Sequence, residues 1–300
     1  MTYDLTVGTF TPSFLIALGR RDGRFAEAGL SVTEESVTSS PQQFRSLAQG
    51  DYDVVFTNTD NIIAYQFLLD NPLKELLSLR VFAGIDRGLG LGLYRGAHVD
   101  RAVRSGRLGV DVAISGFAFV AYEILARQGF SLDEMTIENL GATPRRARAL
   151  IEGTCDYTIL NAGNELHAAQ RGCVLVEPVT AIGPYLGTVL AAMRTDDEKK
   201  VATQNRFRDV LDDTMMSVLS GFRDADVIGA VQELLGLDDD AARQHLRAIK
   251  DLSTGLVPGA GVDVASITTV LALRKRHRPS EVLNGVLGAL DTFIDSDVLV

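Results

Sequence analysis

The sequence contains no tryptophan, two cysteines and four histidines, and none of its apolar runs reaches the length that spans a bilayer. The cysteines, Cys155 and Cys173, cannot form the disulfide network of a small secreted scaffold. Cys155 lies in "GTCDYTIL", a pattern typical of a buried strand, and we interpret it as a core thiol. Because no CxxC or HxxxH spacing occurs, we expect no metal and no cofactor.

Positive charge is also scarce, since 29 lysines and arginines stand against 39 aspartates and glutamates and the formal net charge is −10. An acidic chain is a poor partner for nucleic acid or for an anionic membrane surface, so we expect no nucleic-acid binding and no direct membrane insertion. The basic clusters Arg145, Arg146, Arg148 and Arg274, Lys275, Arg276 are interpreted as solvated helix faces, with Arg145 kept as a weaker candidate for ligand contact.

The first residues, "MTYDLTVGTF", lack the basic segment and the apolar segment of an export signal. We therefore expect a cytoplasmic protein as the sequence stands. An extracytoplasmic or periplasmic protein whose signal has been removed is the alternative.

The chain does have the material for a large core, because 46% of its 300 residues are hydrophobic, and its length suggests two domains. Strand-like and helix-like blocks alternate over residues 1–195, which predicts an α/β fold. "YDLTVGTF" predicts a strand ending at Gly8 or Thr9, and Thr11-Pro12 predicts the start of the next helix. From Asp196 onward the pattern is that of four or five amphipathic helices.

Two further local patterns lead to specific expectations. Asp60 follows the strand "YDVVFTN" and is a plausible cap for the next helix. Gly88, Gly90 and Gly92 alternate with leucines, which predicts a strand with one bare face; a phosphate-binding loop is the alternative.

Two blocks of the chain match at a constant offset of 103 residues, as Pro144 lies 103 residues after Pro41. Each match falls where a helix begins, where a helix ends or where a strand ends. The pairs are Pro41 and Pro144, Leu47 and Leu150, Gly50 and Gly153, Asp53 and Asp156, Asn58 and Asn161, and Asn61 and Asn164.

This internal repeat predicts two similar α/β lobes. In an open α/β sheet the carboxyl ends of the strands border the ligand crevice, so facing lobes would each supply one asparagine corner to a shared cleft. The asparagines alternatively serve only to cap the following helices, and the two roles are compatible.

Residues 1–195 resemble ABC solute-binding proteins of the nitrate/sulfonate/taurine and thiamine-pyrimidine type, through "GRFAEAGLSV", "SSPQQFRSLAQGDYDVVFTNTDN", "RLGVDVAISGFAFVAYEILARQGF" and "GATPRRARALIEGTCDYTILN". The resemblance implies a type II periplasmic-binding-protein fold, with two similar α/β lobes joined by a two-strand hinge near 85–88 and 181–187. Lobe one would comprise 1–86 and 186–300, with the C-terminal helices packed on it, and lobe two would comprise 87–185.

In that family the ligand contacts come from loops after strands, and the resemblance implies a corresponding site here. Helix starts suit a carboxylate, sulfonate or phosphate, while Phe10, Phe117 and Tyr185 are placed either to sandwich a flat ring or in the core. Arg87 is a candidate partner for an anionic ligand. The implied site residues are Thr9, Phe10, Thr11, Ser13, Ser39, Ser40, Thr57, Asn58, Asn61, Arg87, Ser115, Gly116, Phe117, Thr143, Asn161, Asn164 and Tyr185.

Two functions fit this sequence. The first is a protein that binds a small anionic, aromatic or heterocyclic ligand by closing its two lobes, with an ABC permease as partner if the chain is exported. The second is a cytoplasmic enzyme on the same fold, such as a decarboxylase, a desulfinase or another lyase. The chain shows no nucleophile and base pair, which favours binding, and its acid–base candidates are Asp60, Asp86, Glu165 and His167. The cysteine-rich motif of the pyrimidine-synthase relatives is absent, and an effector-sensing module is a third possibility.

Overall fold

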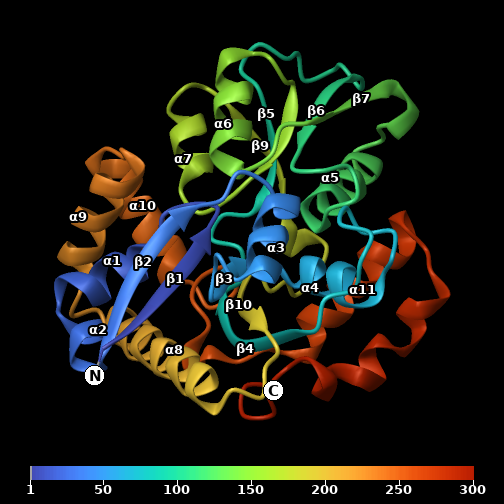
Figure 1. Ribbon diagram of the computed structural model, residues 1–300. Coiled ribbons are helices and arrows are strands. Elements are labelled where there is room, and N and C mark those ends of the chain that lie inside the picture. The colour runs from blue at the N-terminus through green and yellow to red at the C-terminus, as the bar shows by residue number, and fades with distance from the viewer. Residues whose placement is uncertain (1) are drawn as a thin grey trace.

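The computed structural model describes residues 2–300 and contains two five-stranded sheets, one above the other in Figure 1. We call the lower sheet and its helices the first lobe, and the upper sheet and its helices the second lobe. The first sheet consists of β1 (Tyr3–Thr9), β2 (Leu30–Ser36), β3 (Val54–Thr57), β4 (Leu79–Asp86) and β10 (Thr188–Met193). The second consists of β5 (Gly92–Arg95), β6 (Gly106–Val110), β7 (Met135–Asn139), β8 (Tyr157–Leu160) and β9 (Val174–Pro178).

The two sheets have the same topology. In the first, β1 pairs in parallel with β2 and β3, and β10 lies antiparallel between β3 and β4. In the second, β6 pairs in parallel with β7 and β8, and β5 lies antiparallel between β8 and β9. The strand orders β2-β1-β3-β10-β4 and β7-β6-β8-β5-β9 therefore correspond element by element, which confirms the repeat predicted from the sequence.

The repeat extends to single hydrogen bonds. Asp53 accepts the Thr6 N–H through its carboxylate at 2.9 Å and donates its own N–H to the Thr6 carbonyl. Asp156 makes the same pair of bonds with Arg107, at 2.7 Å and 2.9 Å. In each half an aspartate thus fixes the register between the first strand, β1 or β6, and the strand that carries the asparagine corner, β3 or β8.

Between β1 and β9 lie seven α-helices, and the starts of several reflect local chemistry. Pro41 and Pro144 each occupy the first turn of a ten-residue helix that a left-handed glycine ends, as the sequence predicts. The helices are α1 (Phe14–Arg21), α2 (Arg24–Glu27), α3 (Ser40–Gln49), α4 (Thr59–Phe67), α5 (Gly116–Arg127), α6 (Thr143–Glu152) and α7 (Asn164–Ala169), with short helical turns at η1 (Leu132–Glu134) and η2 (Val179–Ala181).

Two predicted helix starts are wrong. α1 begins at Phe14 rather than at Pro12, because the hydroxyl of Ser13 accepts the Ile16 N–H and caps the helix there. The cap of α4 is Asn58 and not Asp60, because the Asp60 carboxylate is buried in an ion pair and is not free to bind backbone N–H groups.

The glycine-rich segment from Gly88 onward is predicted to be a strand, but it is a turn over most of its length. The strand β5 begins only at Gly92. Gly88, Leu89 and Gly90 have φ values of 113°, 47° and 82°, in the left-handed region that no extended strand can contain. Leu89 is held in this conformation by its N–H, which donates to the Thr254 carbonyl, and by its carbonyl, which accepts the Ala162 N–H, both at 2.8 Å.

The chain passes between the sheets twice, through 87–91 and through 182–187. The two passages touch, since a Cβ on Gly187 would lie 2.5 Å from the Cα of Gly88, and the Gly187 N–H donates to the Asp86 carbonyl at 2.8 Å. The predicted domain limits after residues 86 and 185 fall in these passages, and the division of the chain into domains at those limits stays a prediction.

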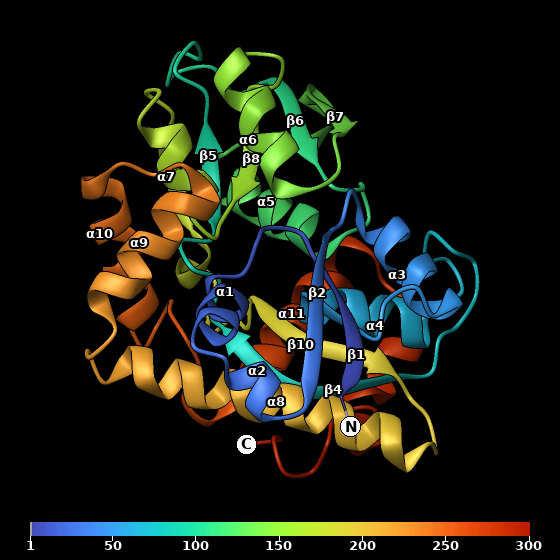
Figure 2. The ribbon, with the colours of Figure 1, turned by 60° about the vertical axis from the view of Figure 1, so that its left-hand side comes forward.

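The remaining chain is mostly helical and lies against both lobes. The sequence predicted packing on lobe one alone, so the contacts with the second lobe are an addition to that prediction. Figure 2 shows α8 along the first sheet, with α9 and α10 reaching up to α7 of the second lobe. α11 bonds to α4 of the first lobe through Arg274 and Asp60, while its His277 stacks on Phe119 of α5 at 6.0 Å. The bounds are α8 (Glu198–Leu219), α9 (Asp224–Leu235), α10 (Asp239–Lys250), η3 (Pro258–Ala260), α11 (Val264–His277) and η4 (Glu281–Thr292).

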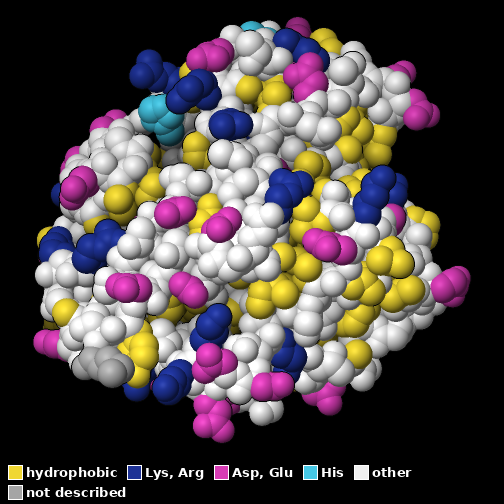
Figure 3. Space-filling model, in the orientation of Figure 1, with side chains coloured by type: hydrophobic (Ala, Val, Ile, Leu, Met, Phe, Trp, Pro, Cys, Tyr) yellow, Lys and Arg dark blue, Asp and Glu magenta, His cyan; other side chains and the backbone are white. Residues whose placement is uncertain are grey.

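On the face in Figure 3, acidic and basic side chains are interspersed rather than gathered into one basic area. Between residues 2 and 300, no helix combines the length and the apolar character needed to cross a bilayer.

We predict that the buried pair between Arg274 and Asp60 is a major determinant of stability. Both side chains are at most 3% exposed. Two hydrogen bonds join them, each with a nitrogen-to-oxygen distance of 2.6 Å. Arg274→Met leaves the carboxylate buried and unpaired, and we expect it to lower the free energy of unfolding by about 3–5 kcal/mol in urea denaturation.

Arg276→Met is the matched control on the same helix. Arg276 is 63% exposed and pairs with Glu123 at 3.1 Å, so its loss is expected to cost less than about 1 kcal/mol. Equal losses for the two variants would contradict the assigned role of Arg274.

Candidate functional site

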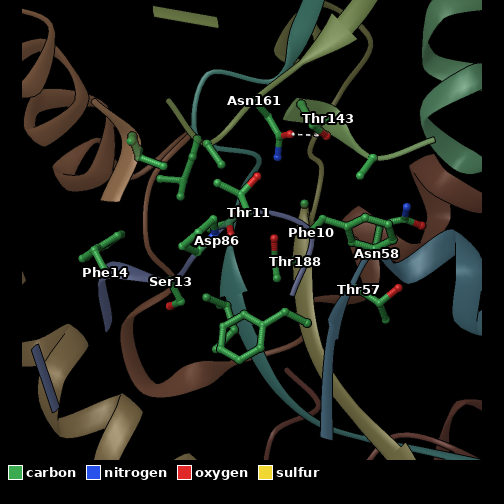
Figure 4. Close-up of a pocket in the computed structure, with 18 of the residues that line it drawn as sticks. Phe10, Thr11, Ser13, Phe14, Thr57, Asn58, Asp86, Thr143, Asn161 and Thr188 are labelled. Carbon is green, nitrogen blue, oxygen red and sulfur yellow. Dashed lines mark hydrogen bonds between the residues drawn. The ribbon is translucent and has the colours of Figure 1, made fainter. Parts of the chain in front are cut away.

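A cavity of about 110 Å³ lies between the two sheets, with walls from both lobes (Figure 4). The ends of β1, β3 and β8 and the starts of α1, α4, α5 and α6 border it, as expected for the carboxyl ends of parallel strands. Of the residues predicted for the site, those that line the cavity are Phe10, Thr11, Ser13, Thr57, Asn58, Ser115, Phe117, Thr143 and Asn161.

Helix caps supply part of the polar wall. The side chains of Ser13, Asn58 and Ser115 accept N–H groups of α1, α4 and α5 at 3.4, 2.9 and 3.3 Å. Asn58 therefore caps a helix and also lines the cavity, and its contact with a ligand stays a prediction. The positive ends of these helix dipoles point toward the space that a ligand would occupy.

Asn161 differs from its counterpart Asn58, because the helix that follows it is capped by Gly163 without a side-chain bond. The side-chain oxygen of Asn161 accepts the Thr143 hydroxyl at 3.4 Å. The side-chain amide nitrogen of Asn161 makes no hydrogen bond within residues 2–300. Figure 4 shows this side chain directed toward Thr11 and Thr188 across the cavity. Asn161 is thus a donor available to a ligand.

The lobes are in direct contact around the cavity. The Ala142 N–H of the second lobe donates to the Thr38 carbonyl of the first at 3.0 Å, and the Asn164 amide donates to the Thr11 hydroxyl at 3.2 Å. These bonds join the two lobes directly beside the cavity.

Arg146 brings a buried positive charge to the cavity wall. Its guanidinium is 2% exposed and donates to the Gly141 carbonyl at 3.0 Å, the Ile159 carbonyl at 2.5 Å and the Thr143 hydroxyl at 2.8 Å. In the described part of the chain none of its bonds goes to a carboxylate. Burial lowers the pKa of Arg146 to about 10, so the group stays charged near neutral pH.

Two carboxylates also reach the cavity. Asp86, at the end of β4, accepts the Gly88 N–H at 2.7 Å, and burial raises its pKa to about 6 against the opposing effect of hydrogen bonds from Thr188 and Gly88. Asp111, after β6, accepts the Ser40 N–H of the first lobe with both oxygens, at 3.3 and 3.1 Å.

One end of the cavity is apolar and is formed by the C-terminal helices. Leu234 and Leu235 of α9 lie there with Phe14, and His245 of α10 meets Phe14 edge to face at 6.4 Å. Burial lowers the pKa of His245 to about 4, so its imidazole is neutral near pH 7. The site therefore combines a polar wall of strand ends with an apolar extension.

The other predicted site residues lie outside this lining. Thr9 bonds to Glu34 and Asn61 to Thr57, while Ser39 and Ser40 form the start of α3. Arg87 donates to Asp263 at 2.8 Å, so its charge is balanced within the first lobe. Gly116 packs against Asp60, Asn164 bonds across the lobes to Thr11, and Tyr185 is buried in the core.

Sequence reasoning missed several residues of the cavity wall. Arg146 was assigned to a solvated helix face, but its neighbours Arg145 and Arg148 are exposed and Arg146 points inward. The offset of 103 residues was the available signal, since it pairs Arg146 with the buried Gln43. Asp86 was considered only as an acid–base group, and the residues Asp111, Thr188, Leu234, Leu235 and His245 gave no local signal.

The acid–base candidates other than Asp86 lie away from the cavity lining. Asp60 is paired with Arg274, Glu165 is buried beneath Gly90, and His167 lines a separate groove with Arg148 and Arg171. Both cysteines are buried free thiols. Over residues 2–300, no three histidine, cysteine or acidic side chains are grouped so that they could hold a metal ion.

Comparison with solved structures shows the same architecture at low sequence identity. The nitrate-binding protein NrtA from Synechocystis PCC 6803 aligns with a TM-score of 0.77 and 10% identity, over 99% of this chain and 87% of that one. The alkanesulfonate-binding protein SsuA from Xanthomonas axonopodis pv. citri, bound to MOPS, aligns with a TM-score of 0.69 and 16% identity, over 92% and 93%.

A conserved Candida albicans protein described as having the generic periplasmic-binding-protein fold aligns with a TM-score of 0.71 and 13% identity, over 98% of this chain and 96% of that one. No family model and no curated protein matches the sequence. Together with the two lobes and two crossings, these likenesses confirm the predicted type II periplasmic-binding-protein fold.

We predict a pH dependence of stability that originates at Asp86. Because its pKa is raised above 3.8 on folding, the folded protein binds the proton more tightly than the unfolded chain does, and ionisation destabilises the fold as pH rises. Between about pH 4.5 and pH 7.5 this group is expected to remove about 2 kcal/mol from the free energy of unfolding.

Asp86→Asn retains an acceptor for the Gly88 N–H and removes the titration. Urea denaturation at both pH values should show the variant gaining about 2 kcal/mol relative to wild type as pH rises. A difference between the two proteins that does not change with pH would contradict the assignment.

Proposed function

We propose that the protein binds a small organic ligand between its two lobes and closes over it, as solute-binding proteins of ABC import systems do. The observation that carries this proposal is the cavity between the lobes, where the matching strand ends of the two halves meet. A cavity at that position, with an apolar wall and a few convergent polar groups, is the usual form of a small-molecule site.

The lining favours a ligand with an anionic group and an apolar body. Arg146, the Asn161 amide and the helix starts offer donors to an anion, and the leucines of α9 offer an apolar surface. Asp86 further favours a ligand that carries a hydrogen-bond donor near the hinge. Phe10 and Phe117 lie in the wall and are proposed to contact a flat ring where the ligand has one.

The neighbours named above support binding rather than turnover, since they are described as nitrate-binding and alkanesulfonate-binding proteins. No finding supports the lyase alternative. Nitrate-binding NrtA is described as periplasmic, which favours an extracytoplasmic location over the cytoplasmic one expected from the sequence. Delivery of the ligand to a membrane permease belongs to the same proposal.

A thermal-shift screen tests the function. The compounds are ethanesulfonate, propionate, benzoate, a pyrimidine set and the neutral amides of the acids. A ligand present at a hundred times its Kd is expected to raise Tm by about 5 °C and to be recovered unchanged by mass spectrometry. If no compound raises Tm, or if the ligand is recovered chemically altered, the proposal is wrong.

Asn161 and Asn58 should respond differently to substitution by alanine. Asn58→Ala removes a helix cap and is expected to lower the free energy of unfolding by about 1 kcal/mol. Asn161→Ala removes a donor that caps no helix, so it should weaken the ligand found in the screen roughly tenfold with a smaller loss of stability. Calorimetric titration and urea denaturation of both variants measure the two effects, and unchanged affinity for Asn161→Ala would remove this residue from the site.

A further inference from the structure

The two halves use one scaffold with different charges beside the cavity. Gln43, in the first turn of α3, donates its amide to the Phe56 carbonyl at 3.0 Å. Arg146, in the first turn of α6, donates to the Ile159 carbonyl at 2.5 Å. Residues 43 and 146 lie 103 apart, as do 56 and 159, so these contacts are the same contact in the repeat. The first half makes it with a neutral side chain and the second with a permanent cation.

The start of α3 already holds an anion that belongs to the protein. Asp111 reaches across from the second lobe, and both of its oxygens accept the Ser40 N–H at the first residue of α3. The carboxylate lies at the positive end of the helix dipole. Asp111 is 8% exposed, so this is an interior contact between the lobes.

The start of α6 has hydrogen-bond donors that correspond to those of α3, but no carboxylate of the described chain accepts them. The Thr143 N–H matches that of Ser40 and makes no hydrogen bond within residues 2–300. The Asn161 amide nitrogen is also without a partner, although this side chain is only 8% exposed and is directed into the cavity (Figure 4). Arg146 adds a positive charge that forms no ion pair within residues 2–300, although the nearby Asp111 carboxylate acts on it through space and opposes the lowering of its pKa by burial.

The residue that corresponds to Asp111 in the first half is Phe10. Gly8 of β1 pairs with Val55 as Gly109 of β6 pairs with Thr158, so β1 and β6 match at an offset of 101 residues, from 8 to 109. Position 10 therefore corresponds to position 111. The first half therefore carries the ring of Phe10 at this position, where a carboxylate could have bonded to the start of α6. The donors at the start of α6 are thus left for the ligand.

We infer that Asp111 serves as a built-in anion at the start of α3, and that the single anionic group of the ligand binds at the matching start of α6. This inference rests on the proposed function and adds the place and the charge of the bound group. The group accepts the Thr143 N–H, the Asn161 amide and the remaining N–H of the Arg146 guanidinium. One compact monoanionic head, such as a carboxylate or a sulfonate, satisfies these donors.

The built-in acid also sets specificity. A ligand with a second acidic group would bring that group toward Asp111 or toward Asp86, the two carboxylates of the cavity wall. Because like charges in a buried site repel each other strongly, such a ligand would bind more weakly. Asp111 is therefore a specificity-determining residue that rejects dianions, as well as a bond between the lobes.

Bromide tests the inference without knowledge of the natural ligand. In crystals soaked in sodium bromide, we expect an anomalous peak within hydrogen-bond distance of the Thr143 N–H and Arg146, and none at the Ser40 N–H. Arg146→Gln, which installs the residue found at position 43, should abolish the peak. Arg145→Gln removes the same charge from an exposed neighbour and should retain it.

Asp111→Ala supplies the complementary result. With the built-in acid removed, a second bromide should appear at the Ser40 N–H. A wild-type bromide at Ser40, no bromide at Thr143, or equal occupancy in the two arginine variants would overturn the inference. These outcomes are distinct from failure of the proposed function, which depends on organic ligands rather than on a halide.

A solution measurement extends the test to ligand class. Propionate and propionamide have the same size and differ in charge. Calorimetric titration is expected to show that wild type prefers propionate, and that Arg146→Gln weakens propionate roughly ten- to a hundredfold while changing propionamide little. Succinate should bind more weakly than propionate to wild type, and Asp111→Ala should reduce that difference. Equal affinity of wild type for propionate and propionamide would contradict the assignment of an anionic head to α6.

Discussion

The contact between Gly88 and Gly187 is the constraint on which the arrangement of the two lobes depends. Both passages between the sheets run through this point, and a side chain on Gly187 would collide with the backbone of Gly88. Because both passages run through this point, the carboxyl strand ends of the two sheets meet around the cavity beside it. Asp86 lies beside the same contact, so the geometry of the crossing and one charge of the cavity are determined together.

Features that depend on neighbours in the chain were predictable from the sequence. A proline in the first turn, a left-handed glycine after the helix and an aspartate that joins two strands recur at one offset, and each has a local physical cause. These marks were enough for the α/β class, the repeat and the meeting of two asparagine corners. The starts of α1 and α4 were misplaced because several polar residues in a row can cap a helix, and the choice depends on which of them is needed elsewhere.

Features that depend on distant segments were not predictable. Arg145 and Arg146 are adjacent in one helix, and only the packing of α6 on β8 decides which of them is buried. The apolar end of the cavity comes from α9 and α10, more than two hundred residues from Phe14, which they contact. A repeat also does not reveal the residues in which its halves differ. In this molecule the differences at positions 43 and 146 and at positions 10 and 111 supply two of the charges in the cavity wall.

The position of α11 determines how the lobes can separate. Arg274 bonds to Asp60 in the first lobe and to the Ile114 carbonyl of the second at 3.2 Å, and His277 stacks on Phe119 close by. One flank of the molecule is thereby joined by an ion pair and an aromatic stack, while on the other flank α10 packs on α7 and Asn164 bonds to Thr11. Opening the cavity therefore breaks the charged and aromatic contacts of α11 or the packing of α10 on α7, so the C-terminal helices take part in whatever motion admits a guest.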